Sequence, residues 1–256
     1  MRARQKGQRR AGLRATGLSL AWRQIIAAQL PIFAKLPLDL RRRLEGLINQ
    51  FIDEVTFVGC EGQEITDKVR VTIAAQACLL IVNKPNRWYK TLDTIYVYPS
   101  AFKSQVTEYG GFLKTEKEVV RLGESWERGP VVLAWDHSAY GGFMPDDGAN
   151  VVFHEFAHQL DQQSGAMDGA PLLDREQNAG QWGRVMQAAF ERHKAALERG
   201  QKPLIDPYGA SAPAEFFAVV TELFFERPHD LRKAEPHVYR EVAEYFKLDP
   251  ATWEMA

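Results

Sequence analysis

Cysteine is scarce in this chain of 256 residues, where Cys60 and Cys78 are the only two. Two cysteines cannot build a disulfide framework or a cysteine-rich zinc site, so we expect a cytoplasmic protein. The chain also lacks an apolar run long enough to cross a membrane. Its formal net charge of −1 gives no overall electrostatic reason to expect binding to nucleic acid or to an anionic membrane.

Acidic residues are missing from the N-terminal segment. None precedes Asp39, whereas arginine and lysine are frequent near the N-terminus, and no uninterrupted apolar segment of the kind found in signal peptides follows them. We interpret residues 1–16 as a basic, disordered tail, with an interaction arm and a transit-type presequence as alternatives. We expect residues 17–256 to form one domain, with a helical part over 17–90 and a second part over 91–256 that carries the chemistry.

Hydrophobic periodicity divides the chain into helical ends and a β-rich middle. Apolar residues recur at helical spacing in the segments 22–55, 67–80, 181–199, 214–226 and 236–247. The runs with strand character are Thr94–Tyr98 and Val131–Trp135. Segments that predict loops are 136–148, 165–180 and 203–213. Helices, a few strands and then helices again indicate an α+β fold.

The most informative stretch is His154-Glu-Phe-Ala-His158, because its spacing places two imidazoles one turn apart on the same face of a helix. Two neutral imidazoles so placed can hold one Zn²⁺, and Glu155 lies where it can take a proton from an attacking water. Asn150 is a suitable N-cap, and the apolar residues on the opposite side predict that this helix docks on a core. A surface helix with two unrelated histidines is the alternative.

A catalytic zinc ion usually takes three protein ligands, so the third ligand must come from elsewhere in the chain. A metzincin-type histidine is excluded because Ser164 occupies its position. Glu215 is the best-placed carboxylate, since Pro213 favours a helix start and puts Glu215 in the first turn. Carboxylates that spacing alone leaves open as alternatives are Glu222, Glu176 and Asp161.

Five segments of the sequence are informative when taken together, namely Ala74–Leu80, Val97–Pro99, Gly129–Trp135, Asn150–Asp161 and Asp206–Val219. Through these segments, and over most of its length from about Trp22 to Trp253, the chain resembles the Mlc titration factor A family of zinc peptidases. This resemblance implies a catalytic domain similar to that of anthrax lethal factor, which is a zincin-like fold of the gluzincin type.

The same resemblance implies zinc on His154, His158 and Glu215. It gives Tyr208 a role, as a hydroxyl that donates to the oxyanion of the tetrahedral intermediate. Glu155 is expected to be the general base, and the strand Val131–Trp135 is a candidate edge for pairing with an extended peptide.

The resemblance also implies an aminopeptidase-like activity on small peptides and binding to the glucose repressor Mlc. An interaction protein that sequesters this transcription factor, with a vestigial zinc site, is the alternative function. A zinc ion that only stabilises the fold is less consistent with three evident ligands, because structural sites are normally closed by four.

Overall fold

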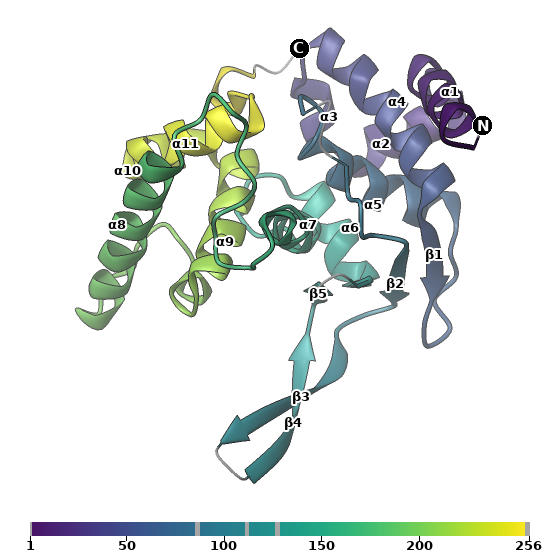
Figure 1. Cartoon of the computed structure of the whole chain (residues 1–256). Helices are drawn as coiled ribbons and strands as arrows, with labels where there is room; N and C mark the ends of the chain where they lie inside the picture. The colour runs from purple at the N-terminus through teal and green to yellow at the C-terminus, as the bar shows by residue number, and fades with distance from the viewer. Residues whose placement is uncertain (1, 85–87, 111–112, 126–128, 254–256) are drawn as a thin grey trace.

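The computed structural model describes residues 2–84, 88–110, 113–125 and 129–253. Helices dominate, and they pack against a small mixed sheet (Figure 1). This architecture confirms the expected α+β class. No helix among the described residues is long and apolar enough to cross a membrane.

The main sheet has four strands in the order β1-β2-β6-β5. Strands β1 (Thr56–Gly59), β2 (Thr94–Tyr98) and β6 (Val131–Ala134) are parallel, and the short β5 (Gly123–Ser125) pairs with β6 in the antiparallel sense. The expectation of an open edge at Val131–Trp135 is therefore wrong, because β2 and β5 pair with β6 on its two sides. The edge of the sheet on this side is β5.

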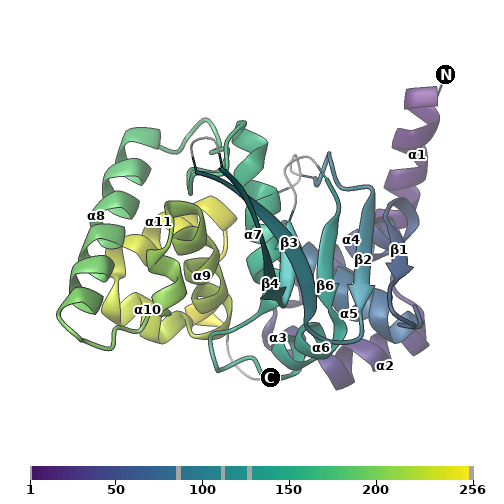
Figure 2. The ribbon, with the colours of Figure 1, turned by 90° about the horizontal axis from the view of Figure 1, so that it is seen from below.

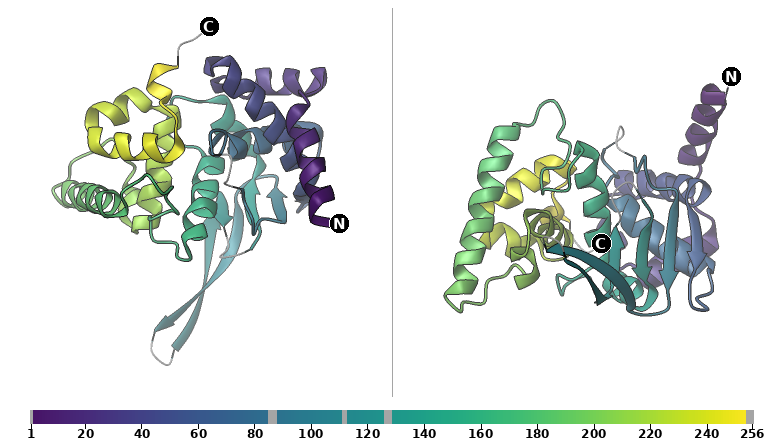
Figure 3. Two further views of the ribbon diagram at one scale, coloured as in Figure 1. Left: turned by 45° about the horizontal axis from the view of Figure 1, so that its top comes forward. Right: turned by 60° about the horizontal axis from the view of Figure 1, so that its bottom comes forward.

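A second, two-stranded sheet was not expected from the sequence. It is the antiparallel hairpin of β3 (Phe102–Gly110) and β4 (Leu113–Arg121). The hairpin extends beyond the body of the molecule (Figures 1 and 3).

The N-terminal helices lie on one face of the main sheet (Figure 2). They are α2 (Leu20–Gln29), α3 (Ile32–Lys35), α4 (Leu38–Glu54) and α5 (Asp67–Leu79). Thr66 caps α5 by accepting a hydrogen bond from the Val69 amide. Ile95 and Val97 of β2 are fully buried in the continuous apolar core that these helices share with the C-terminal half.

Helix α1 (Arg2–Ala15) replaces the disordered tail that the sequence suggested. Its basic residues find acidic partners on α4, where Arg9 pairs with Asp53 and Arg10 forms two hydrogen bonds with Glu54. Burial raises the pKa of Glu54, but the contacts with Arg10 outweigh burial and leave this pKa below its ordinary value. The segment is ordered by charges distant in the sequence, at the outer side of α4 (Figure 3).

The C-terminal half is built from helices. They are α6 (Trp135–Phe143), α7 (Val151–Asp161), α8 (Ala179–Glu198), α9 (Pro213–Glu226), α10 (Pro228–Ala234) and α11 (Pro236–Phe246), with 3-10 turns η1 (Gln162–Ser164), η2 (Pro207–Ala210) and η3 (Pro250–Thr252). Helix α7 lies between the sheet and helices α8 to α11 (Figures 1 and 2).

Helix α6 corrects the expectation of a loop over 136–148. Its glycines are packing positions, because a Cβ on Gly142 would lie 2.9 Å from Leu30 Cδ2 and a Cβ on Gly141 would lie 3.1 Å from Asn150 Cα. The absent side chains let α6 approach α2 and the start of α7 closely.

Candidate metal centre and active site

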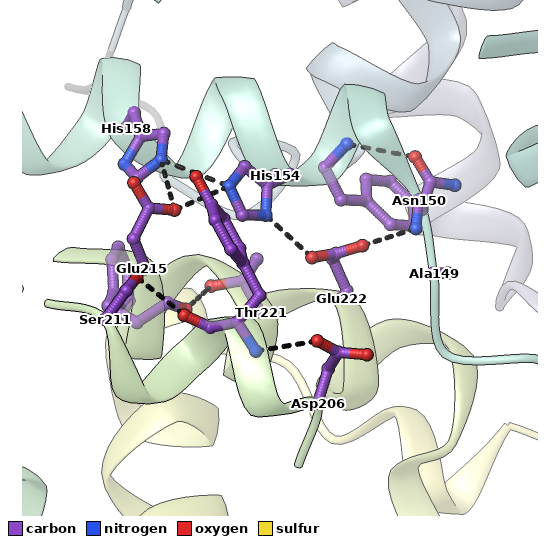
Figure 4. A network of polar contacts seen from close by, with 12 residues as sticks. Ala149, Asn150, His154, His158, Asp206, Ser211, Glu215, Thr221 and Glu222 are labelled. Atoms are coloured by element: carbon purple, nitrogen blue, oxygen red, sulfur yellow. Dashed lines mark hydrogen bonds and ion pairs between the residues drawn. The ribbon is translucent and has the colours of Figure 1, made fainter. Parts of the chain in front are cut away.

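Helix α7 presents two chemically different sides. Asn150 is its N-cap, as expected, and accepts a hydrogen bond from the Phe153 amide at 3.0 Å. Phe153 and Phe156 are buried in the core. With its apolar side anchored, α7 directs His154 and His158 toward α9 (Figure 4).

Three side chains from two helices converge between α7 and α9. His154 Nε2 and His158 Nε2 lie 3.2 Å apart, and Glu215 Oε2 lies 2.9 Å from the first and 3.3 Å from the second. Glu215 belongs to the first turn of α9, which begins at Pro213. Among the described residues, His154, His158 and Glu215 are the group whose ligand atoms are close enough together to hold one metal ion.

We call the three ligand atoms of His154, His158 and Glu215 the ligand triangle. The protonation state of His154 decides whether this triangle can bind a cation. Its Nδ1–H donates to Glu222 Oε1 at 2.8 Å, so in the neutral imidazole Nε2 carries a lone pair. That lone pair faces a carboxylate oxygen and a second imidazole nitrogen. A cation in the centre could accept a lone pair from each of these three atoms. Two imidazole nitrogens with one carboxylate oxygen are a ligand set that suits zinc.

Without a cation, the carboxylates stabilise a proton on His154. Burial lowers its pKa, but hydrogen bonds with Glu215 and Glu222 outweigh burial and hold the pKa well above the ordinary value. Burial likewise raises the pKa of Glu215, and its hydrogen bonds with His154 and His158 outweigh burial and hold that pKa far below the ordinary value. The pocket therefore attracts positive charge, whether a proton or a metal ion carries it.

Glu222 contacts His154 at Nδ1, the ring nitrogen that does not face the other two ligand atoms. It is buried on α9, and its second oxygen accepts from the Asn150 amide at the start of α7. Burial raises the pKa of this carboxyl. A carboxylate that accepts from the far nitrogen of a histidine fixes the tautomer and the ring orientation. The spacing that puts Glu222 two turns after Glu215 was the sequence signal for this contact.

Glu226 extends the same face of α9. Its carboxyl oxygens accept from the Asn150 side-chain amide and from the Gly148 backbone amide, both at 3.0 Å. Asn150 also donates to Gln76 at 2.9 Å, so one residue links α7, α9 and α5. This buried network fixes the start of α7 relative to α9.

The Glu226 carboxyl gives the stability of the fold a pH dependence. Burial is the main cause that raises its pKa from 4.5 to about 9. The folded state then binds more protons than the unfolded state, so this contribution to stability is complete below about pH 4.5 and is lost as the pH rises through 9. The free energy of unfolding of the wild type, minus that of Glu226→Gln, should fall by up to about 1.4 kcal/mol per pH unit. Urea titrations at pH 6, 7 and 8 measure this difference, and a flat difference would refute the assignment.

Glu155 lies beside the triangle, in a cavity of about 480 Å³. The other side chains and backbone that line the cavity are Leu122, Gly123, His137, Tyr140, Ala149, Asn150, Val151, His154, Tyr208 and Glu222. Glu155 is only 6% exposed, and a Cβ on Gly123 of β5 would lie 2.6 Å from its Cγ and its Oε1. The edge strand therefore passes directly over the Glu155 side chain, and a side chain at position 123 would force Glu155 and Val151 to shift.

Tyr208 stands at the mouth of this cavity. Its ring centroid lies 5.8 Å from that of His154, and the side chain is half exposed. Asp206 caps the η2 turn by accepting from the Tyr208 amide at 2.8 Å. The turn thus holds Tyr208 on the same side of the triangle as Glu155.

The remaining carboxylates that spacing left open lie elsewhere. Glu176 has a side chain that is 85% exposed, close to Lys247. Asp161 is fully buried and accepts from the Gly169 amide. Neither belongs to the triangle.

Sequence reasoning missed part of the cavity wall. Gly123 gave no signal because β5 is too short for a recognisable periodicity, and Leu122 precedes it. His137 and Tyr140 were assigned to a loop, whereas they lie on α6. An apolar wall with exposed Leu122 and Tyr140 beside buried acids is typical of a ligand cleft.

The chain is similar in sequence to known proteins over most of its length. The chain is 42% identical over 231 residues to an uncharacterized protein of Synechocystis sp., covering 90% of this chain and 84% of the relative. It is 30% identical over 240 residues to Mlc titration factor A of Klebsiella pneumoniae, covering 90% and 87% of the two chains. It is 29% identical over 241 residues to Mlc titration factor A of Escherichia fergusonii, covering 91% and 88%.

The model of one protein family matches almost the whole chain. Residues 3–247 match the glucose-regulated metallo-peptidase M90 family. The expected resemblance to Mlc titration factor A is confirmed by these relatives. The chain therefore belongs to the M90 family of glucose-regulated metallo-peptidases.

Proposed function

We propose that the protein is a zinc-dependent peptidase with a zincin-like catalytic fold. The observation that carries the proposal is the convergence of His154 Nε2, His158 Nε2 and Glu215 Oε2 within 3.3 Å of one another, beside a cleft lined by Glu155. Three protein ligands leave a coordination position for water or substrate, as in catalytic zinc sites. Membership of a metallo-peptidase family supports the same activity.

A zinc ion held by His154, His158 and Glu215 would polarise the peptide carbonyl and would lower the pKa of the attacking water, so that a base can take its proton. Glu155 accepts the proton of the attacking water at its carboxylate and returns it to the leaving amine. Its near-complete burial under β5 shields this proton transfer from bulk solvent. Glu222 holds His154 in the tautomer whose Nε2 is free to bind metal.

The substrate backbone is proposed to lie along β5, the edge strand of the sheet. An extended peptide can add to such an edge through main-chain hydrogen bonds. Gly123 would then let the scissile bond approach Glu155 without a side chain between them. Tyr208, which lines the same cleft, would donate a hydrogen bond from its hydroxyl to the developing oxyanion.

The direct test is a screen of peptide and aminoacyl substrates with and without a zinc chelator. We expect hydrolysis that chelation abolishes and that added Zn²⁺ restores. Substrates with free and with acetylated N-termini separate the aminopeptidase-like activity that the family resemblance implies from endopeptidase action. Hydrolysis that persists at full rate in the chelated protein would reject a metal-dependent mechanism.

A second candidate function is binding to the transcriptional repressor Mlc. It is favoured by the name of the relatives that match about nine-tenths of this chain, Mlc titration factor A. In that case the surface outside the cleft carries the function, and the metal site is not needed for it.

A further inference from the structure

The segment between α7 and α8 is held by the helix that carries both histidines, and it packs against the start of α9, the helix that carries Glu215. Asp161, the last residue of α7, is completely buried, and its Oδ2 accepts from the Gly169 amide at 2.7 Å. Gly169 is buried as well and has a φ of +78°, a backbone conformation that side chains disfavour. One end of α7 therefore holds this loop by a buried hydrogen bond.

Gly169 in turn packs its backbone on the first residues of α9. A Cβ built on Gly169 would lie 2.5 Å from the carbonyl oxygen of Pro213 and 3.4 Å from the nitrogen of Ala214. Glu215 follows directly in the sequence. The main chain at Gly169 thus contacts the main chain at Pro213, two residues before Glu215. Any side chain at position 169 would push these two segments apart.

A third contact fixes the same glycine. Trp182 of α8 donates its indole N–H to the Gly169 carbonyl at 3.1 Å. Trp182 is 2% exposed, and its ring centroid lies 5.8 Å from that of Phe217 on α9. The N-cap of α9 is Ala212, which provides no side-chain cap, so the position of the first turn depends on neighbouring segments.

We propose that Asp161 and Gly169 are positioning residues that set the distance between α7 and the first turn of α9 and so hold Glu215 against the two histidines. The inference rests on the proposed function and goes beyond it by naming what preorganises the ligand triangle. Metal ligands need to be held within about 0.5 Å of their productive positions, which is less than the displacement that a methyl group on Gly169 requires.

The test compares two alanine substitutions in one loop. Gly169→Ala introduces the contact with Pro213, whereas Gly165→Ala has the same kind of strain, at a φ of +108°, but no atom within 4 Å of the new Cβ. Zinc affinity is measured by competition with a chelator, and the unfolding temperature is measured on the metal-free proteins. We expect Gly169→Ala to bind zinc at least about tenfold more weakly than Gly165→Ala, as substitutions behind metal ligands typically do.

A second pair of variants keeps the inference testable if Gly169→Ala fails to fold. Asp161→Asn retains an oxygen that accepts from the Gly169 amide, and Asp161→Ala does not. Zinc affinity should remain near that of the wild type in the first variant and fall in the second. The glycine pair is the primary test, because Asp161 also lies one turn after His158 on α7.

Two outcomes would overturn the inference, and they are distinguishable. If the wild type binds zinc and Gly169→Ala binds it as tightly as Gly165→Ala, with only its unfolding temperature lowered, the loop is structural and does not position Glu215. If the wild type does not bind zinc at all, the proposed function itself fails, and the positioning role fails with it.

Discussion

Replacement of Glu155 by glutamine should reduce peptide hydrolysis by about 10² to 10⁴-fold, the usual contribution of a general base. The amide has nearly the shape of the carboxylate, so it fits under Gly123, but it cannot accept a proton at neutral pH. Zinc content should stay at the wild-type value, because Glu155 is not one of the converging ligand atoms. Steady-state kinetics together with metal analysis of the same sample measure both quantities.

A matched control for this variant is Glu191→Gln on the exposed side of α8, where the glutamate contacts Gln187. It makes the same chemical change away from the cleft and should leave hydrolysis unaltered. Normal hydrolysis by Glu155→Gln would remove Glu155 from the mechanism. The same variant separates the two candidate functions, because an interaction with Mlc that is independent of catalysis should persist in it.

Replacement of Glu215 by glutamine should weaken zinc binding by more than the 10–100-fold that is typical of residues behind the ligands. A neutral amide oxygen is a poor ligand for zinc, and the negative charge that attracts the cation is lost. The helix itself should persist, because Phe216 and Phe217 remain buried in the core. Hydrolysis at limiting zinc should fall in parallel with the affinity.

Glu176→Gln is the control for this substitution. Spacing alone did not exclude Glu176 as the third ligand, yet its side chain is 85% exposed and lies near Lys247. Zinc affinity should therefore be unchanged in Glu176→Gln. Retention of zinc by Glu215→Gln, with loss in Glu176→Gln, would contradict the ligand set.

Local sequence signals were sufficient to predict α7 and α9, the two helices that carry the ligand triangle. Asn150 is a cap whose side chain accepts the expected amide, and the spacing of His154 and His158 fixes their shared face. Pro213 starts α9, so the register of Glu215 followed from the sequence. What spacing could not supply was the approach of α7 to α9, because that depends on tertiary packing.

The incorrect predictions of a loop over 136–148 and of a disordered N-terminal tail have a common physical cause. The glycines of α6 were interpreted as loop residues, although Gly142 makes room for Leu30. The basic N-terminal segment was interpreted as disordered because the partners of Arg9 and Arg10, Asp53 and Glu54, lie 44 residues further along the chain. In each case a contact between distant segments outweighs the local preference, and a single sequence does not reveal such contacts.

The edge of the sheet illustrates the same limit. Val131–Trp135 precedes the His helix in the sequence, and it was therefore expected to pair with an extended peptide along its edge. Both edges of β6 are instead occupied, because β2 pairs with it on one side and β5 on the other. The strand that borders the cleft is β5, whose three residues are too few to show a pattern.

The central claim is that His154, His158 and Glu215 hold a catalytic zinc ion, and anomalous X-ray diffraction at the zinc absorption edge tests it most directly. We predict one anomalous peak per chain within about 2.0–2.2 Å of His154 Nε2, His158 Nε2 and a Glu215 carboxylate oxygen. A zinc-saturated crystal with no anomalous peak between α7 and α9, or with the ion bound at other residues, would contradict it.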